Sequence, residues 1–182
     1  MSLGSDILAI YQQRGSAAYF GERVSMAEHG LQAAHFAQSE RAPQPLVLAA
    51  LLHDIGHLLE QVPETIEDWT HDARHEQTGA RWLARHFGAA VSEPVRLHVA
   101  AKRYLCATDA GYLARLSPAS VHTLKLQGGP MSVQEVAQFE RERFCHEALR
   151  VRRWDDQGKV AGLKTSTLSD YTSLIERVAL RG

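Results

Sequence analysis

The feature that most constrains the fold is an apolar, leucine-rich segment at residues 45–59 that carries polar residues in its middle. A helix that is apolar on all sides belongs at the centre of a fold, so this segment predicts a buried central helix. His53 and Asp54 lie within it, and burial of an unpaired carboxylate costs several kcal/mol. A metal ion is the strongest compensation for that charge. A buried His–Asp pair without metal is an equally good interpretation of these residues alone.

Capping and breaking residues predict further helices. Ser-x-x-Glu capping boxes at residues 25–28 and 132–135 predict helices over 25–39 and from 132 to about 151. Another helix is predicted from about 73 to 87, ended by Gly88, and the next over 92–105, with Ser92 as its cap and Pro94 in its first turn. Ser117 followed by Pro118 repeats this pattern of a capping serine and a first-turn proline, and predicts the start of another helix. The remaining predictions are a surface loop over 61–71 and an amphipathic helix over 169–180.

No segment alternates convincingly with a period of two, so we expect an all-α fold that forms a single domain over residues 1–182. The 20 Lys and Arg against 21 Asp and Glu leave a net charge of −1, which argues against nucleic acid as a partner. The longest apolar run, 46–52, is too short to span a membrane, and no targeting segment is evident. Two cysteines, Cys106 and Cys145, are too few for a disulfide scaffold, so a reducing, cytoplasmic location is expected.

Histidines are abundant and recur at regular intervals. Four lie on separate predicted helices, at His29, His53, His75 and His98, and an aspartate pair follows at 155–156. This order of His, His-Asp, His, His and Asp resembles the HD-domain superfamily of metalloproteins, in its binuclear branch. The resemblance implies a helical bundle around a buried binuclear metal site.

The resemblance also implies how the ligands are shared between the two ions. The implied sets are His29, His53, Asp54 and Asp155 for one ion, and Asp54, His75 and His98 for the other. Asp54 is then the bridge, and a bridging carboxylate lowers the repulsion between two close cations. Imidazole and carboxylate ligands favour iron or manganese over structural zinc. Asp156 stays open as an alternative to Asp155, because neighbours on a helix point in different directions. The expected surface or packing histidines are His35, His71, His86, His122 and His146.

Other segments resemble a narrower group, the mixed-valence diiron oxygenases typified by the glycine-forming 2-amino-1-hydroxyethylphosphonate dioxygenases. Tyr19-Phe20-Gly21-Glu22 precedes the first ligand histidine. In that family a tyrosine at this place occupies the substrate position on the second iron, and a glutamate three residues later holds the substrate amino group. Tyr19 and Glu22 match these two positions. Further similar segments at 98–104, 120–131 and 150–156 extend the resemblance over roughly residues 19–159.

The resemblance implies an Fe(II)/Fe(III) pair, O2 as co-substrate and a small organophosphonate substrate. The implied reaction converts (R)-2-amino-1-hydroxyethylphosphonate and O2 to glycine and phosphate. The implied catalytic residues are Tyr19, Glu22, His57 and Lys102, and the implied substrate-binding residues are Glu22, His57, Lys102, Ser120, Gln127 and Arg152. Cationic groups suit a phosphonate, and a carboxylate suits an ammonium group.

Two other functions stay open. The first is a metal-dependent hydrolase of nucleotides or other phosphate esters, for which a tyrosine on the metal would be an obstruction. The second is a non-catalytic HD module, which the complete ligand set disfavours. The substituent on the substrate is open too, since a trimethylammonium group would suit an aromatic or uncharged cage better than a glutamate. The sequence does not indicate the oligomeric state.

Overall fold

The computed structural model describes residues 2–60 and 72–180, and the regular secondary structure in this part of the chain is helical. The elements are α1 (Leu3–Arg14), α2 (Met26–Ser39), α3 (Gln44–Leu52), α4 (Ile55–Leu59), α5 (His75–Leu83), α6 (Ala89–Thr108), α7 (Tyr112–Arg115), α8 (Pro118–Leu126), α9 (Val133–Phe139), α10 (Cys145–Gln157), the 3-10 turn η2 (Leu168–Tyr171) and α11 (Thr172–Val178). The all-α prediction is confirmed. The loop predicted over 61–71, and His71 with it, lies outside the described residues.

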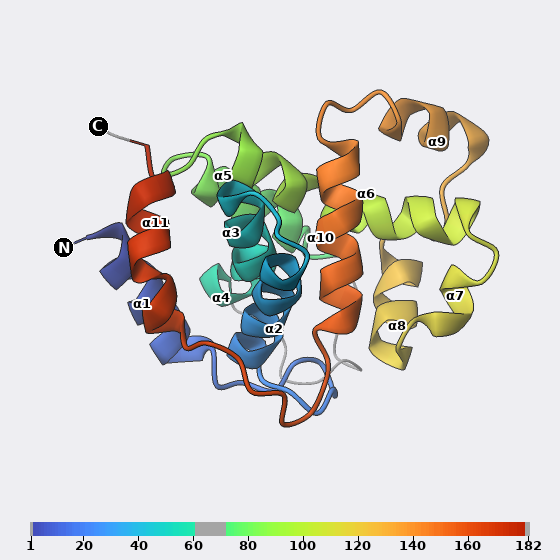
Figure 1. The fold of residues 1–182 in the computed structure, drawn as a ribbon. Coiled ribbons are helices and arrows are strands. Elements are labelled where there is room, and N and C mark those ends of the chain that lie inside the picture. Colours follow the sequence, from blue (N-terminus) through green and yellow to red (C-terminus); the bar gives the residue numbers. More distant parts are fainter. Residues whose placement is uncertain (1, 61–71, 181–182) are drawn as a thin grey trace.

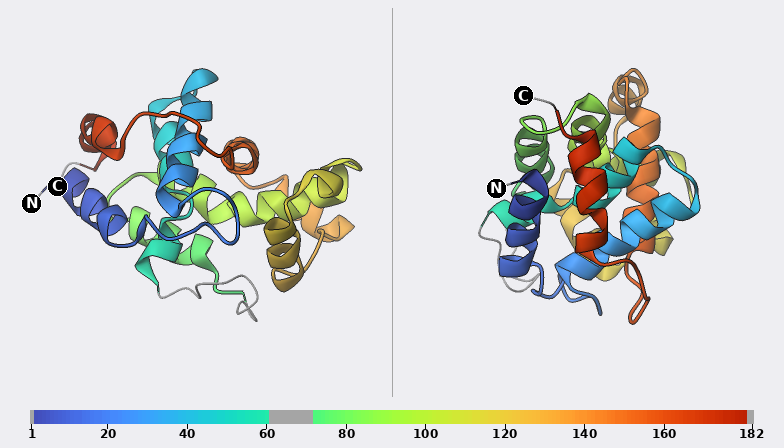
Figure 2. Two further views of the ribbon diagram at one scale, coloured as in Figure 1. Left: turned by 90° about the horizontal axis from the view of Figure 1, so that it is seen from below. Right: turned by 60° about the vertical axis from the view of Figure 1, so that its left-hand side comes forward.

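Helices α2, α3, α6 and α10 form the centre of the bundle (Figure 1). Helix α10 packs against α6 and α2, α3 packs against α2 and α6, and α5 packs against α6 and α4. Helices α1 and α11 lie side by side at one edge, as the views of Figure 2 also show. Helices α7, α8 and α9 gather at the opposite end, around the C-terminal half of α6.

The hydrophobic core is divided unequally. The main cluster takes its buried side chains from the helices around α3, and Leu48, Leu51 and Leu52 of α3 are fully buried in it. A smaller cluster joins the C-terminal half of α6 to α9 and α10 through Leu97, Ala101, Phe139, Cys145 and Ala148. The elements that carry the four spaced histidines therefore meet at the larger core.

The central segment differs from its prediction as one helix over 45–59. It forms two helices, α3 and α4, because the backbone leaves the helical path at Asp54, where φ is −101° and ψ is 13°. Close to this break, a Cβ at Gly56 would lie 2.0 Å from the carbonyl oxygen of His75, so α4 and α5 approach at a distance that only glycine allows. The break places His53 and Asp54 at a helix junction.

Helix α6 begins earlier than predicted. Gly88, expected to end the preceding helix, is the N-cap of α6, and α5 already ends at Leu83. Ser92 does not cap the helix; its amide bonds to the carbonyl of Gly88 at 3.3 Å and its side chain is buried. Pro94 consequently lies inside α6, where it lacks the amide that would bond to the preceding turn.

The local capping predictions are confirmed, whereas two helix lengths are not. Ser25 and Ser132 both form the predicted capping boxes, and Ser117 caps α8. The segment predicted as one helix from 132 to about 151 is two, α9 and α10, separated by turns at 140–144, and Phe139 and Cys145 on either side of these turns both pack in the smaller core cluster. The predicted C-terminal helix begins as the η2 turn and ends at Val178. No sequence signal had predicted α1 or α7.

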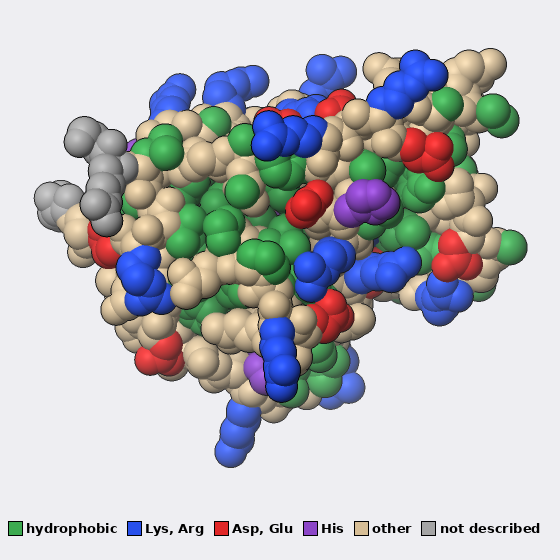
Figure 3. All heavy atoms as spheres, turned by 45° about the horizontal axis from the view of Figure 1, so that its top comes forward, with side chains coloured by type: hydrophobic (Ala, Val, Ile, Leu, Met, Phe, Trp, Pro, Cys, Tyr) green, Lys and Arg blue, Asp and Glu red, His purple; other side chains and the backbone are tan. Residues whose placement is uncertain are grey.

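Charged side chains of both signs are interspersed on the face shown in Figure 3, in keeping with the net charge of −1. None of the described helices is long and apolar enough to cross a membrane. Cys106 and Cys145 lie on α6 and α10, and both are free thiols.

Candidate metal centre

Four imidazoles and two carboxylates converge where α2, α5, α6 and α10 meet the α3–α4 junction. Each of these six side chains belongs to a residue that is at most 7% exposed: His29, His53, Asp54, His75, His98 and Asp155. The chain therefore buries the whole set that the His and Asp spacing singled out.

The two oxygens of Asp54 face different histidine pairs. Oδ2 lies 3.5 Å from Nε2 of His29 and 3.3 Å from Nε2 of His53. Oδ1 lies 3.2 Å from Nε2 of His75 and 3.5 Å from Nε2 of His98. Two three-residue groups with metal-ligand spacing thus share Asp54, one with His29 and His53 and the other with His75 and His98. This is the arrangement of a bridging carboxylate.

Backbone carbonyls fix the orientation of three of the imidazoles. Nδ1 donates to a carbonyl oxygen in each: His29 to Gly158 at 2.8 Å, His53 to Ala50 at 2.8 Å, and His98 to Val95 at 2.7 Å. With the proton held on Nδ1, Nε2 of each neutral ring presents its lone pair to the centre. Nδ1 of His75 faces Glu76, with 3.7 Å to Oε2.

The spacing of the Nε2 atoms fits metal ions. Nε2 of His29 lies 3.0 Å from Nε2 of His53, and Nε2 of His75 lies 3.1 Å from Nε2 of His98. When His29 and His53 are both neutral with Nδ1 protonated, their two Nε2 lone pairs face each other, and a cation between them removes that repulsion. Burial alone would raise the pKa of Asp54, but His53 and the neighbouring imidazoles hold it well below its usual value. The chain has a buried binuclear His/Asp metal site.

Asp155, and not Asp156, faces the first histidine pair. Oδ1 of Asp155 lies 3.3 Å from Nε2 of His29 and has no hydrogen-bond partner within the described part of the chain. Its Oδ2 pairs with Nη1 of Arg152 at 2.7 Å. Asp156 instead accepts hydrogen bonds from Tyr112 and Arg152. The geometry thus favours Asp155 over Asp156 as a further ligand of the His29 group.

Tyr19 stands against the bridging carboxylate. Its hydroxyl donates to Oδ2 of Asp54 at 2.9 Å, and its ring stacks on His29 with centroids 3.8 Å apart. It therefore approaches from the side of the His29 and His53 pair, whereas the resemblance implied a place on the second ion. Burial, reinforced by Asp54 and Asp155, raises the pKa of the phenol well above its usual value. Its role as a ligand stays a prediction.

A small cavity of about 30 Å³ opens beside these carboxylates and imidazoles. Of the residues predicted for the site, those that line it are Tyr19, Asp54, His57, His75, His98, Lys102, Ser120, Gln127, Arg152 and Asp155. His29 and His53 lie behind this wall. Glu22 is half-buried but does not line the cavity, although its Oε1 is buried without a hydrogen-bond partner among the described residues.

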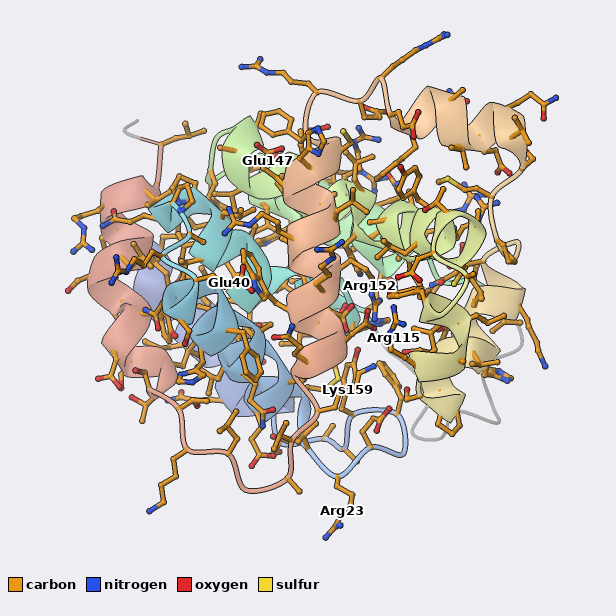
Figure 4. All side chains as sticks on the ribbon, turned by 45° about the vertical axis from the view of Figure 1, so that its right-hand side comes forward. Arg23, Glu40, Arg115, Glu147, Arg152 and Lys159 are labelled. Carbon is orange, nitrogen blue, oxygen red and sulfur yellow. The ribbon has the colours of Figure 1, made fainter. Side chains whose placement is uncertain are left out.

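Three cations meet in the cavity. Nζ of Lys102 donates to Oγ1 of Thr123 at 2.9 Å, and burial, aided by Arg152, lowers the pKa of this lysine to about 7. Arg152 projects from α10, and Lys159 follows the end of that helix (Figure 4). Nζ of Lys159 donates to Oγ of Ser120 at 3.0 Å. A wall with this charge suits an anion.

Aromatic and amide groups complete the lining. His57 stacks on His75 with centroids 3.8 Å apart and meets Phe20 edge-on, and burial together with His75 lowers its pKa well below the usual value. Oε1 of Gln127 is buried without a hydrogen-bond partner in the part of the chain described. Phe20 adopts a left-handed backbone conformation, with φ of 46°.

Sequence reasoning had given no role to Phe20, Thr123 or Lys159, which line the same cavity. Phe20 and Thr123 lie inside segments that carried the resemblance, so their position there was an available signal. Lys159 lies directly after Gly158, whose carbonyl holds His29, but nothing local marks it.

Residues 20–156 match the model of the HD-domain family. The chain belongs to the HD-domain family. This HD-domain protein is 44% identical to the 1-hydroxy-2-(trimethylamino)ethylphosphonate dioxygenase (glycine-betaine-forming) of Leisingera caerulea, over 93% of this chain and 86% of that one. It is 45% identical to the hydroxymethylphosphonate dioxygenase of Gimesia maris, over 94% of this chain and 86% of that one. An uncharacterized protein of Acanthamoeba polyphaga mimivirus is 33% identical over 93% of this chain and 78% of its own length.

Proposed function

We propose that this HD-domain protein is a diiron oxygenase that uses O2 to cleave the C–P bond of a 1-hydroxyphosphonate. The observation that carries the proposal is the single cavity onto which both the Asp54-bridged metal site and the three cations open. The two relatives at 44% and 45% identity are named for hydroxyphosphonate dioxygenases, which supports the same reaction class here.

The proposed metals are two iron ions, Fe(II) and Fe(III). The proposed ligands are His29, His53, Asp54 and Asp155 for one ion, Asp54, His75 and His98 for the other, and Tyr19. Imidazole and carboxylate donors without thiolate suit iron. When bound, the iron pair would supply the redox chemistry that activates O2.

The chain's own residues would bind and orient the substrate. Lys102 and Arg152 would hold the phosphonate by charge-assisted hydrogen bonds, and Ser120 and Gln127 would contribute neutral ones. His57, kept neutral by burial, would border the reacting carbon and exclude water together with Phe20. Holding the hydroxyl-bearing carbon beside the metals is the protein's contribution to the rate.

The finer proposal for the substrate is (R)-2-amino-1-hydroxyethylphosphonate, with glycine and phosphate as products. It is supported by Glu22, whose Oε1 is buried without a hydrogen-bond partner among residues 2–60 and 72–180. The amide of Glu22 bonds to the carbonyl of Tyr19 at 2.8 Å, so a movement of Tyr19 would carry Glu22 with it. Since the two relatives are named for a trimethylammonium substrate and for an unsubstituted one, the substituent is the part of the substrate most open to change.

The decisive experiment measures O2 uptake and phosphate release by iron-reconstituted protein. The substrates are (R)-2-amino-1-hydroxyethylphosphonate, its trimethylammonium analogue and hydroxymethylphosphonate. We expect two iron ions per chain and phosphate release matched by O2 uptake, with glycine as the product from the amino substrate. Glu22→Gln should lose its preference for that substrate over hydroxymethylphosphonate. Phosphate release from nucleotides without O2 uptake, together with inactivity on all three phosphonates, would establish the hydrolase instead.

A further inference from the structure

Lys159 is the cavity cation to which no sequence pattern assigns a role. Its ammonium donates to Oγ of Ser120 at 3.0 Å and lies 5.8 Å from the centroid of the Tyr19 ring. The residue is half-buried and lines the cavity together with Lys102 and Arg152. It therefore lies between the Tyr19 side of the cavity and the α8 side.

The charge balance of this wall is uneven. Arg152 is paired with both Asp155 and Asp156. By contrast, within residues 2–60 and 72–180 no carboxylate oxygen lies within 4.0 Å of the ammonium of Lys102 or of Lys159. Two lysine amino groups without a carboxylate partner in one cavity indicate an anionic ligand, which would favour the charged form of both.

The backbone around Lys159 is held firmly. Gln32 of α2, only 1% exposed, makes two hydrogen bonds with Val160: its Nε2 donates to the carbonyl and its Oε1 accepts from the amide, both at 2.9 Å. On the other side of Lys159, the carbonyl of Gly158 accepts from His29. The backbone of Lys159 is thus fixed by the contacts of both neighbouring residues. Its long side chain can still change hydrogen-bond partners.

We propose that Lys159 is the third cation of the phosphonate subsite and sets the preference of that subsite for a doubly charged anion over a singly charged one. The inference rests on the proposed function and adds a specificity-determining residue to it. In the ligand-free chain the ammonium is held by the Ser120 hydroxyl and the face of the Tyr19 ring, both neutral partners. A phosphonate oxygen is the stronger partner and takes their place.

The test compares the binding of two anions that share a hydroxymethyl group, hydroxymethylphosphonate and glycolate. Binding is measured by calorimetry on iron-loaded protein without O2, so that no turnover occurs. The variants are Lys159→Gln and Lys159→Arg, with Lys164→Gln as the matched control. Lys164 is an exposed lysine five residues away that does not line the cavity. Iron content is measured in each variant, because Lys159 adjoins the Gly158 anchor.

Lys159→Gln should weaken hydroxymethylphosphonate binding roughly tenfold and glycolate binding much less, with iron content unchanged. Lys159→Arg should restore the preference, and Lys164→Gln should match the wild type. Equal weakening of both anions, or no change, would overturn the role of Lys159 while phosphonate-dependent O2 uptake by the wild type still upheld the proposed function. If the wild type bound no phosphonate and took up no O2, both proposals would fall.

Discussion

The two walls of the cavity are held in place by different kinds of contact. We call the metal-binding side the metal wall: Asp54, His75 and His98 line the cavity there, and His29 and His53 lie behind them. The imidazoles of His29, His53 and His98 are each oriented by a backbone carbonyl. We call the side that carries the three cations the anion wall, and its contacts are between side chains. Lys102 bonds to Thr123, Lys159 to Ser120, and Arg152 to Asp155 and Asp156. Helix α8, which carries Ser120 and Thr123, adjoins the main core through Ala119 and Leu126, whereas Phe139 of α9 belongs to the smaller cluster.

This difference determines what substitutions can change. A backbone carbonyl is present whatever residue occupies its position, so the imidazole orientation survives most substitutions around it. A contact between two side chains is lost when either one changes. The anion wall can therefore be altered one residue at a time while the metal wall is kept, which is how one HD-domain scaffold could serve different hydroxyphosphonates.

The largest effect should come from breaking the metal wall at the bridge. Asp54→Ala removes the carboxylate whose two oxygens face both histidine pairs, so both metal positions should be lost and O2 uptake abolished. Metal analysis after iron reconstitution measures this. Asp109→Ala, at the exposed C-cap of α6, is the control and should keep both ions. Two ions retained in Asp54→Ala would show that the histidine pairs do not depend on the bridge.

The next effect should be confined to the anion wall. Lys102→Ala removes a buried ammonium from the cavity, and a charge-assisted hydrogen bond contributes about 1.5–3 kcal/mol. The apparent affinity for the phosphonate should fall by roughly 10- to 150-fold with both iron ions still bound. Steady-state kinetics and metal analysis on the same sample separate the two readouts. Wild-type kinetics in this variant would make Lys102 an ordinary buried lysine.

The same lysine should make stability depend on pH in a defined direction. Burial, with help from Arg152, lowers the pKa of Lys102 from 10.5 to about 7 in the folded chain. Between these two values the unfolded chain holds the proton and the folded chain does not, so the free energy of unfolding should rise with pH. The rise from one group is at most about 1.4 kcal/mol per pH unit. Below about pH 7 both states are protonated and the dependence should vanish.

Urea denaturation of metal-free wild type and Lys102→Met, between pH 6 and 9, measures this effect. The wild type should gain stability relative to the variant as the pH rises above about 7, because methionine carries no proton. Taking the difference cancels the titration of groups that the two proteins share. A difference that is flat with pH would mean that Lys102 keeps its charge in the folded chain.

The local parts of the fold followed from the sequence because their causes are local. A capping box is completed within four residues, and those at Ser25 and Ser132 form as predicted. The break at Asp54 lies next to the close contact between Gly56 and α5, a contact between two helices that the apolar pattern of 45–59 does not record. Propensity correctly predicted helix on both sides of the break but not the break itself.

The candidate site likewise has one part that the sequence predicted and one part that it did not. His53 and Asp54 were predictable as polar residues in an apolar segment, and the order of the other spaced histidines indicated them through its resemblance to the HD-domain superfamily. The partners of the anion wall were harder to predict. Thr123 and Lys159 come from segments on opposite sides of the cavity, and only the packing of α10 against α6 and the return of the chain toward α2 bring them together. Glu22, predicted at the substrate, lies outside the lining.

The smallest effect should come from a residue that touches neither metal nor cavity. The hydroxyl of Tyr112 donates to Oδ2 of Asp156, whose Oδ1 holds Arg152. Tyr112→Phe leaves the buried ring in place but frees one oxygen of Asp156, so Arg152 should be positioned less tightly. Loss of one such hydrogen bond corresponds to roughly 1 kcal/mol, or about a fivefold higher KM for the phosphonate.

In Tyr112→Phe, kcat and iron content should stay at wild-type values, since the metal wall is untouched. Tyr104→Phe is the matched control: Tyr104 lies on α6, and its hydroxyl donates to Glu140 at 2.9 Å at an exposed site outside the cavity. Tyr104→Phe also removes a phenolic oxygen and should leave the KM for the phosphonate unchanged. A fall in kcat or in bound iron in Tyr112→Phe would mean that the two walls are mechanically joined through α10, because Asp155, which faces His29, is the neighbour of Asp156 on that helix. A rise in KM alone would show that the anion wall can be loosened while the metal wall stays as it was.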